Sequence, residues 1–251
     1  MGRNNYRNSA VLLITGSIDI NKNIPHIKLT DTTERLQQYI DSIEYAIKKY
    51  HSIQKIVFAE NTNYLYNYTK LKELSKIYDK ELEIISFQGD QTKASIHGKG
   101  YGEIEIINYA LTNSKLINAS KTIIKLTGRI KVSNFDSVLY SSYGKNSFYY
   151  ISRAIPPYNE TILYKIEKDL FLEKFTEIGN EVFDKEGFYL EYAFLKKIES
   201  LKEYYDFGSF RVYRFLQGIS GSTGNKYNSS LKSKIGNTLY SIFKRFDINK
   251  I

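Results

Sequence analysis

The sequence predicts an α/β protein whose mostly parallel sheet carries helices on both faces. Short apolar runs typical of buried strands occur at residues 10–16, 53–59, 81–87 and 122–126. The segments between them place apolar residues at helical spacing. A parallel connection needs a crossover, usually a helix that covers one face of the sheet. The regular alternation over residues 10–130 therefore favours parallel strands.

Each element of this first part is predicted from its own residues. Residues 10–16 (AVLLITG) form the first strand, and Asp31-Thr-Thr-Glu34 is a helix start with a capping aspartate. The following helix has one apolar face, made of Leu36, Tyr39, Ile40, Ile43, Ala46 and Ile47. A second strand at 53–59, a helix at 64–78 and a third strand at 81–87 follow. After a polar loop, the glycine-rich run 98–102 leads into a helix from Glu103 to about residue 112, then the strand 122–126.

The pattern changes after Asn134. Residues 148–153 are a predicted strand, which Pro156 and Pro157 break. Helices are predicted over 158–178 and 188–201, a strand at 208–213, and a Gly/Ser loop over 218–227. We therefore expect a C-terminal portion of mixed and helical structure.

Composition limits the function classes. The 251 residues have a net charge of +9 and no cysteine, so there is no disulfide framework and no thiolate chemistry. The three histidines are far apart and show no metal-ligand spacing. Because the chain has no apolar run of about 18 residues, we expect a cytoplasmic protein that does not span a membrane. The positive charge favours an anionic partner, which is nucleic acid, an anionic membrane surface or a phosphorylated small molecule.

Four segments are expected to meet at the carboxyl edge of the sheet, where open α/β sheets bind ligands. Glycines there let a ligand approach the backbone, a helix N-terminus favours an anion, and a guanidinium suits a phosphate. The alternative is an ordinary loop and a solvated arginine at a strand end. The candidate binding residues are Thr15, Gly16, Ser17, Glu60, Asn61, Lys99, Gly100, Tyr101, Gly102, Thr127, Gly128 and Arg129.

The run from GKGYGEIEIINYAL to TIIKLTGRI resembles a group of bacterial GT-A-type glycosyltransferases of surface polysaccharide and lipopolysaccharide biosynthesis. That group carries a Lys-x-Thr-Gly-Arg motif, here Lys125 to Arg129. The resemblance covers roughly residues 10–230. It implies a GT-A-like (Rossmann-like) catalytic domain over residues 1–229, with a nucleotide-binding part at about 10–135 and an acceptor part at about 136–229. It also implies hexosyltransferase-type transfer of a sugar from a nucleotide-sugar donor to a glycan or lipid-linked acceptor.

This chain departs from the common members of the superfamily in one respect. In those members, the strand after the loop and helix ends in an Asp-x-Asp metal motif, and no Asp-x-Asp occurs in this sequence. At that place it offers Lys125 and Arg129, so we expect phosphate neutralisation without a metal cofactor. Should an ion such as Mn²⁺ or Mg²⁺ be needed, Glu60 and Asp136 are the ligand candidates.

Two further segments are candidates for the site. Glu191 follows an aromatic pair in a predicted helix and is a candidate general base, with Glu186 as its rival. The alternative is a pair of solvated glutamates. The Gly/Ser loop suits closure over a phosphate, or else is a flexible connection. Its candidate donor-binding residues are Ser220, Ser222, Thr223 and Tyr227.

Residues 230–251 form a basic amphipathic tail. Apolar residues recur at helical spacing from Leu231 to Phe246, and Lys232, Lys234, Lys244 and Arg245 flank them. Such a segment can lie on an anionic membrane surface, which would place the protein at the inner face of the cytoplasmic membrane. The alternative is a terminal helix packed on the domain.

A sugar-nucleotide-dependent glycosyltransferase is the function that these patterns favour. Two alternatives stay open. One is a nucleic-acid-binding module, although the basic residues are spread along the chain and no nucleic-acid-binding signature is present, so we expect no nucleic-acid partner. The other is a nucleotidyltransferase on a doubly wound sheet, which would usually need paired carboxylates and Mg²⁺.

Overall fold

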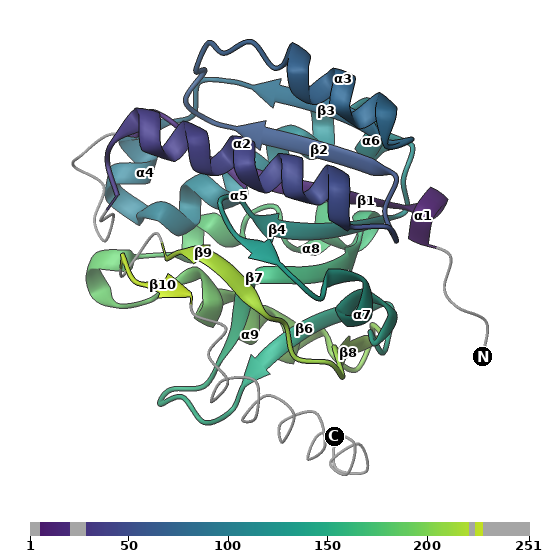
Figure 1. Cartoon of the computed structure of the whole chain (residues 1–251). Helices are drawn as coiled ribbons and strands as arrows, with labels where there is room; N and C mark the ends of the chain where they lie inside the picture. The colour runs from purple at the N-terminus through teal and green to yellow at the C-terminus, as the bar shows by residue number, and fades with distance from the viewer. Residues whose placement is uncertain (1–5, 21–28, 221–223, 228–251) are drawn as a thin grey trace.

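The computed structural model describes residues 6–20, 29–220 and 224–227, and a seven-stranded sheet forms its centre (Figure 1). The strand order is β3-β2-β1-β4-β7-β6-β8. Strands β1 (Ala10–Gly16), β2 (Lys55–Glu60), β3 (Glu81–Ser86) and β4 (Thr122–Thr127) are mutually parallel. Strand β7 (Tyr158–Glu167) runs antiparallel to β4 and β6 (Asn146–Ile151), and β8 (Phe207–Ser209) is parallel to β6. The mostly parallel α/β fold predicted from the sequence is confirmed.

Helices cover both faces of this sheet. Helices α2 (Thr32–Lys49) and α3 (Thr69–Ile77) pack on one face, against the side chains of Leu12 and Ile14. On the other face, Val11 and Leu13 pack in a second core with α5 (Lys99–Asn113), α6 (Lys115–Asn118), α8 (Lys168–Lys174) and α9 (Leu190–Leu201). Figure 1 shows α2 in front of the sheet and α8 behind it. Because successive strand residues point to opposite faces, the uniformly apolar β1 serves both cores.

Helix α2 begins where the sequence predicts. The Asp31 carboxylate accepts a hydrogen bond from the Glu34 backbone N–H at 2.7 Å and caps the first turn. Its predicted apolar face is confirmed, since Tyr39, Ile43, Ala46 and Ile47 are buried. The helix therefore lies firmly over the sheet, next to the carboxyl end of β1.

The connections place a topological switch point between β1 and β4. From β1 the chain adds β2 and β3 on one side, and then returns to add β4 on the other. Thr15 pairs with Thr127 at the carboxyl ends of the two strands, and the Gly128 N–H donates to the Thr15 carbonyl at 2.9 Å. Open α/β sheets bind ligands at this kind of crevice.

A second, three-stranded sheet lies beside that crevice. Its order is β10-β9-β5, made of β5 (Lys131–Val132), β9 (Leu216–Ile219) and β10 (Lys226–Tyr227). Strand β9 is antiparallel to both neighbours. The segment predicted as a Gly/Ser loop over 218–227 is thus partly a hairpin, which brings the end of the described chain next to the turn after β4.

Three sequence-based predictions of secondary structure are wrong. Residues 158–178 were predicted to be one helix, but they form β7 and then the short α8, because residues 158–167 pair with strands on both sides. The helix predicted over 64–78 starts only at Thr69. The glycine-rich run 98–102 is not a loop in front of a helix. Helix α4 (Gln91–His97) ends at Gly98, and α5 begins directly at Lys99.

Strand β7 contains an irregularity that bears on the site. Its pairing with β6 joins Ser147 to Lys165 and Tyr149 to Glu160, so two steps along β6 correspond to five along β7. Such bulges re-aim side chains. Thr161, inside this irregular stretch, hydrogen-bonds to α9.

The other short elements are α1 (Tyr6–Ser9), α7 (Phe135–Tyr140), and the 3₁₀ turns η1 (Ile178–Glu181) and η2 (Asp184–Glu186). Within the described segments, no helix combines the length and the apolar character that crossing a bilayer requires. The basic tail predicted at 230–251 lies outside the described residues.

Candidate functional site

A cavity of about 250 Å³ opens at the carboxyl ends of β1 and β4. Its walls come from the loop after β1, from α2, from the start of α5, from the turn after β4, from β7 and from the start of α9. The C-terminal hairpin closes one side through Ile219, Ser220 and Tyr227. The cavity therefore gathers segments that are far apart in sequence, at the switch point of the sheet.

Most of the residues predicted for the site lie in this cavity. Those that line it are Thr15, Gly16, Ser17, Asn61, Lys99, Gly100, Gly102, Thr127, Gly128, Arg129, Glu191, Ser220 and Tyr227. Four others do not line it: Glu60, Tyr101, Lys125 and Glu186. Ser222 and Thr223 lie outside the described residues.

Arg129 has a constrained backbone geometry. Its backbone φ is +66°, in the left-handed region that glycine favours. On one side, a Cβ on Gly128 would lie 2.4 Å from the Thr15 carbonyl oxygen. On the other, Gly218 has φ +130°, and a Cβ there would lie 2.5 Å from the Arg129 carbonyl oxygen. Two glycines thus let the backbone of β1 and of β9 close on the arginine.

The Arg129 guanidinium is buried but only partly bonded. Its Cζ lies 5.7 Å from the centre of the Tyr39 ring, and its Nη1 donates to the Gln38 side-chain oxygen at 3.1 Å. Its Nε is buried and makes no hydrogen bond with the described residues. An always-charged group with a spare buried donor at a cavity wall is ready to bind an anion.

A second arginine, Arg35, supports this wall from α2. Its guanidinium donates to the carbonyl oxygens of Ser17, Ile18 and Leu29 and so holds the loop after β1. Arg35 also lies close to Tyr39, with its Cζ 6.0 Å from the ring centre. Burial lowers the pKa of Arg35, and the nearby charge of Arg129 lowers it further. Two cations close together make this end of the cavity favourable for an anion.

The start of α5 does not offer an open anion site. The Lys99 N–H donates to Asp184 Oδ2 at 2.9 Å, so a carboxylate from η2 already lies at this helix N-terminus. Lys99, Gly100 and Gly102 nevertheless line the cavity. Tyr101 turns away and stacks on His97, with ring centres 5.4 Å apart.

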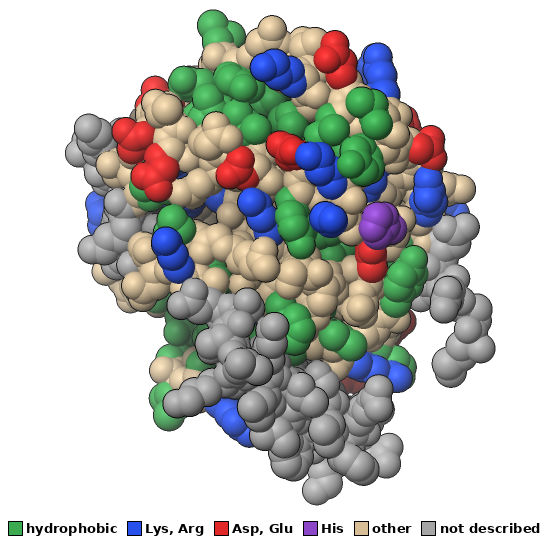
Figure 2. All heavy atoms as spheres, viewed as in Figure 1, with side chains coloured by type: hydrophobic (Ala, Val, Ile, Leu, Met, Phe, Trp, Pro, Cys, Tyr) green, Lys and Arg blue, Asp and Glu red, His purple; other side chains and the backbone are tan. Residues whose placement is uncertain are grey.

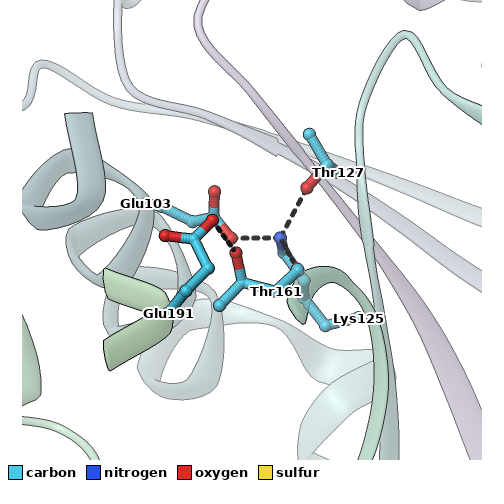
Figure 3. Close-up of polar contacts among 5 residues, drawn as sticks. All are labelled: Glu103, Lys125, Thr127, Thr161 and Glu191. Carbon is cyan, nitrogen blue, oxygen red and sulfur yellow. Dashed lines mark hydrogen bonds and ion pairs between the residues drawn. The ribbon is translucent and has the colours of Figure 1, made fainter. Parts of the chain in front are cut away.

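Lys125 was predicted to neutralise phosphate, but the structure buries it completely beneath the cavity. Its Nζ contacts Glu103 Oε1, donates to Thr127 Oγ1 at 2.7 Å and donates to the Thr161 carbonyl at 2.7 Å (Figure 3). These contacts use all three ammonium protons. A buried ammonium needs such partners, so Lys125 orders the site rather than binding a ligand.

Glu191 and Glu186 are placed differently. Glu191, in the first turn of α9, lines the cavity and accepts a hydrogen bond from Thr161 Oγ1 at 3.1 Å (Figure 3). Burial raises the pKa of the Glu191 carboxyl, and the neighbouring Glu103 raises it further. Glu186 is exposed on η2. Of the two rival candidates, Glu191 is the one that can meet a ligand in the cavity.

The two fallback metal ligands have structural roles. The buried Glu60 carboxylate accepts hydrogen bonds from the Thr62 and Tyr64 N–H groups at 2.8 and 2.9 Å. Asp136 accepts from the His51 and Ser52 N–H groups, both at 3.0 Å. Within the described ranges, no three His, Cys, Asp or Glu side chains gather where they could hold a metal ion. We derive no step through a metal ion.

The loops after β1 and β2 are tied together at the cavity. Ser17 Oγ donates to Asn61 Oδ1 at 2.6 Å, and Asn61 Nδ2 donates to Glu105 at 3.3 Å. Both Ser17 and Asn61 line the cavity. Their polar side chains can therefore contact a ligand while a hydrogen bond fixes their positions.

Sequence reasoning missed Arg35, Tyr39, Glu103 and Thr161 as parts of this site. Arg35 and Glu103 carried a usable signal, because each is a charged residue in phase with the apolar face of its helix. The position of Lys125 was a second signal, because a lysine inside an apolar strand requires a buried partner. Thr161 carried none, because its orientation depends on the irregular pairing of β7.

The surface around α2 differs from a nucleic-acid-binding face. On the face in view in Figure 2, basic side chains alternate with acidic and hydrophobic ones. A nucleic-acid footprint would need basic residues clustered in a patch or stripe. This face supplies none among its described residues.

Comparisons with known proteins were made by sequence and by structure. No protein-family model matches the chain, and neither does any curated protein. Among solved structures, a protein described as a nucleotide-diphospho-sugar transferase from Desulfovibrio desulfuricans G20 matches at 6% identity and a TM-score of 0.45, over 80% of this chain and 79% of that one. The Mn/GDP form of core-mannan synthase A from Aspergillus fumigatus matches at 10% identity and 0.43, over 95% of this chain and 85% of that one. Both TM-scores lie below 0.5, so the functional argument rests on the cavity.

Proposed function

We propose that the protein is a glycosyltransferase that moves a sugar from a nucleotide-sugar donor to an acceptor hydroxyl. The observation that carries this proposal is Arg129, a buried cation with a spare donor at the switch point of the sheet. Arg35 and Lys99 add positive charge to the same cavity. A diphosphate is the anion that such a convergent set of cations suits.

The second half of the cavity supplies the base. In an inverting transfer, Glu191 accepts the proton of the acceptor hydroxyl, whose oxygen bonds to the anomeric carbon. The bond between that carbon and the diphosphate oxygen breaks, and its electron pair leaves with the nucleoside diphosphate. Arg129 stabilises the charge that develops on the departing phosphate. The raised pKa of Glu191 suits it to the proton transfer.

The finer assignment concerns the biological setting. We infer that the acceptor is a glycan or a lipid-linked glycan in bacterial surface-polysaccharide assembly, at the inner face of the cytoplasmic membrane. The Lys-x-Thr-Gly-Arg motif at residues 125–129 and the basic tail support this inference.

A thermal-shift panel tests the function. UDP-, GDP-, CMP- and dTDP-sugars are added separately, and the true donor should raise the unfolding midpoint because it binds the folded state. Arg129→Ala should then weaken binding of that nucleotide by about 1.5–3 kcal/mol in calorimetry, the scale of a hydrogen bond to a charged group.

Arg153→Ala is the matched control. It removes the same charge from an exposed loop residue away from the cavity, so affinity should stay as in the native chain. If no nucleotide sugar raises the midpoint, or if both variants bind equally well, the proposed function is wrong.

A further inference from the structure

Glu103 and Glu191 form a pair of carboxyl groups in one cavity, hereafter the carboxylate pair. Figure 3 shows both groups on the same side of Lys125, with the Thr161 hydroxyl bonded to Glu191. Lys125 contacts only Glu103 of the pair, while it also holds Thr127, the last residue of β4, two positions before Arg129. The pair is therefore connected to the cationic end of the cavity through one buried lysine.

Lys125 and Glu103 form an ion pair beneath the cavity. Lys125 is fully buried, and its ammonium contacts the Glu103 carboxylate. Separating a buried ammonium from its anionic partner would leave an uncompensated charge, which is strongly unfavourable. The ion pair therefore holds the Glu103 carboxylate beside Lys125.

Glu191 faces charged and titratable groups from three elements. Glu103 and Lys99 come from α5, Tyr158 from β7 and Tyr227 from β10. Burial raises the pKa of both tyrosines, so their phenols are neutral near pH 7. Glu103 and Lys99 are thus the ions that act on Glu191, one disfavouring its negative charge and the other favouring it.

We propose that Glu103, fixed by Lys125, is a positioning residue that sets the basicity of Glu191 in the transfer reaction. This proposal rests on the proposed function for its catalytic meaning. An adjacent fixed anion makes Glu191 a better proton acceptor near neutral pH than a solvated glutamate is, and a matched proton affinity speeds general-base catalysis. The Thr161 hydroxyl acts in the opposite sense, because it stabilises the ionised form.

The opposite signs of these two contacts provide the test. The full chain is labelled with glutamate carrying ¹³C at the side-chain carboxyl, and the Glu191 signal is identified by its loss in Glu191→Gln. Its titration midpoint should move to lower pH in Glu103→Gln, which removes the anion. It should move to higher pH in Thr161→Val, which removes the hydrogen bond. Glu199→Gln, an exposed change on the same helix, should leave the midpoint in place.

Unfolding of a variant does not remove the test. If Glu103→Gln does not fold, Glu103→Gln with Lys125→Met leaves no buried charge unpaired. It should still move the midpoint to lower pH, but by less, because the loss of the lysine cation partly offsets the loss of the anion. Thr161→Val is independent of both. Midpoints that stay in place in these variants would overturn the proposal, since a purely structural role moves nothing.

The pH profile of kcat/KM separates this inference from the proposed function. Its acidic limb should move in the same directions as the midpoints, with donor affinity kept. If the midpoints move but the limb does not, Glu103 acts on Glu191 outside catalysis and the proposed positioning role is wrong. If the native chain transfers no sugar at all, the proposed function fails, while the titration still reports whether the carboxylate pair is coupled.

Discussion

Arg129 combines a charged side chain with a backbone conformation that suits glycine. The left-handed region brings the Cβ of an L-residue close to the following carbonyl and costs roughly 1–2 kcal/mol. The surrounding structure maintains this conformation through Gly128, Gly218 and the hydrogen bond to Gln38. Strain of this kind collects at functional sites, where the surroundings over-determine it.

The strain at Arg129 predicts a separation of stability from binding. Arg129→Gly should be more stable than Arg129→Ala by roughly 1 kcal/mol in the free energy of unfolding, because glycine adopts positive φ without the Cβ penalty. In urea titrations, its unfolding midpoint should therefore lie at a higher urea concentration. Both variants should lose nucleotide affinity to the same degree. Equal stability of the two would show that residue 129 is unstrained.

At the scale of elements, the C-terminal hairpin completes the site. Strand β9 pairs with β5 directly after the Arg129 turn, and its Gly218 rests on the Arg129 carbonyl. The hairpin also contributes Ser220 and Tyr227 to the cavity. The element is small, but it fixes both the backbone and one wall of the candidate anion site.

Gly218→Ala should therefore weaken nucleotide binding as well as stability. The new methyl group would lie 2.5 Å from the Arg129 carbonyl oxygen, so β9 or the arginine turn must shift. Gly187→Ala is the matched control, because Gly187 has φ +77° but its added Cβ meets nothing within 4 Å. Calorimetric titration should show loss of affinity in the first variant alone. Equal affinities in the two variants would mean that β9 does not set the arginine.

The parallel half of the molecule was predictable from its sequence because its information is local. Short apolar runs rich in β-branched residues, such as residues 10–16, favour strands buried on both faces, and Asp31 marks the start of α2. Residues 158–167 were not predicted correctly, since they form a strand only by pairing with β4 and β6. The same holds for the site. Arg129 follows from its place after a strand, whereas its contact with Gly218 depends on long-range packing.

At the scale of the whole molecule, the positive charge in the cavity comes from side chains. Arg35, Lys99 and Arg129 line it, and the described residues bring no metal-ligand set together. Three cationic side chains therefore line the cavity beside the carboxyl groups of Glu103, Asp184 and Glu191.

Turnover should survive chelation. Once a donor has been identified, sugar transfer is measured with EDTA and then with added Mn²⁺, and we expect equal rates because fixed cations replace the ion. Loss of activity in EDTA with recovery in Mn²⁺ would contradict this prediction. The ligands would then have to be sought beyond Glu60 and Asp136, whose carboxylates already bind backbone N–H groups.

The basic tail at 230–251 remains a prediction from the sequence. Each lysine or arginine near an anionic surface contributes about 1 kcal/mol, and salt screens the attraction. Binding to phosphatidylglycerol vesicles should fall as salt rises and vanish on truncation after residue 229, while neutral vesicles bind poorly. If the truncated chain unfolds, or neither form sediments with anionic vesicles, the tail is a helix packed on the domain.

The position of β9 in the sequence has a consequence for how the protein is made. A ribosome releases β1 to β4 first, and their short-range crossovers let this half begin to fold while synthesis continues. The arginine turn leaves the ribosome with them, but the strand that holds its backbone is synthesised only near the end of the described chain. The nascent protein should therefore acquire its nucleotide affinity last, after both hydrophobic cores, which extend to Phe194 and Phe210, have been synthesised. A chain cut short before residue 216 would keep the parallel strands and lack the ability to hold a donor.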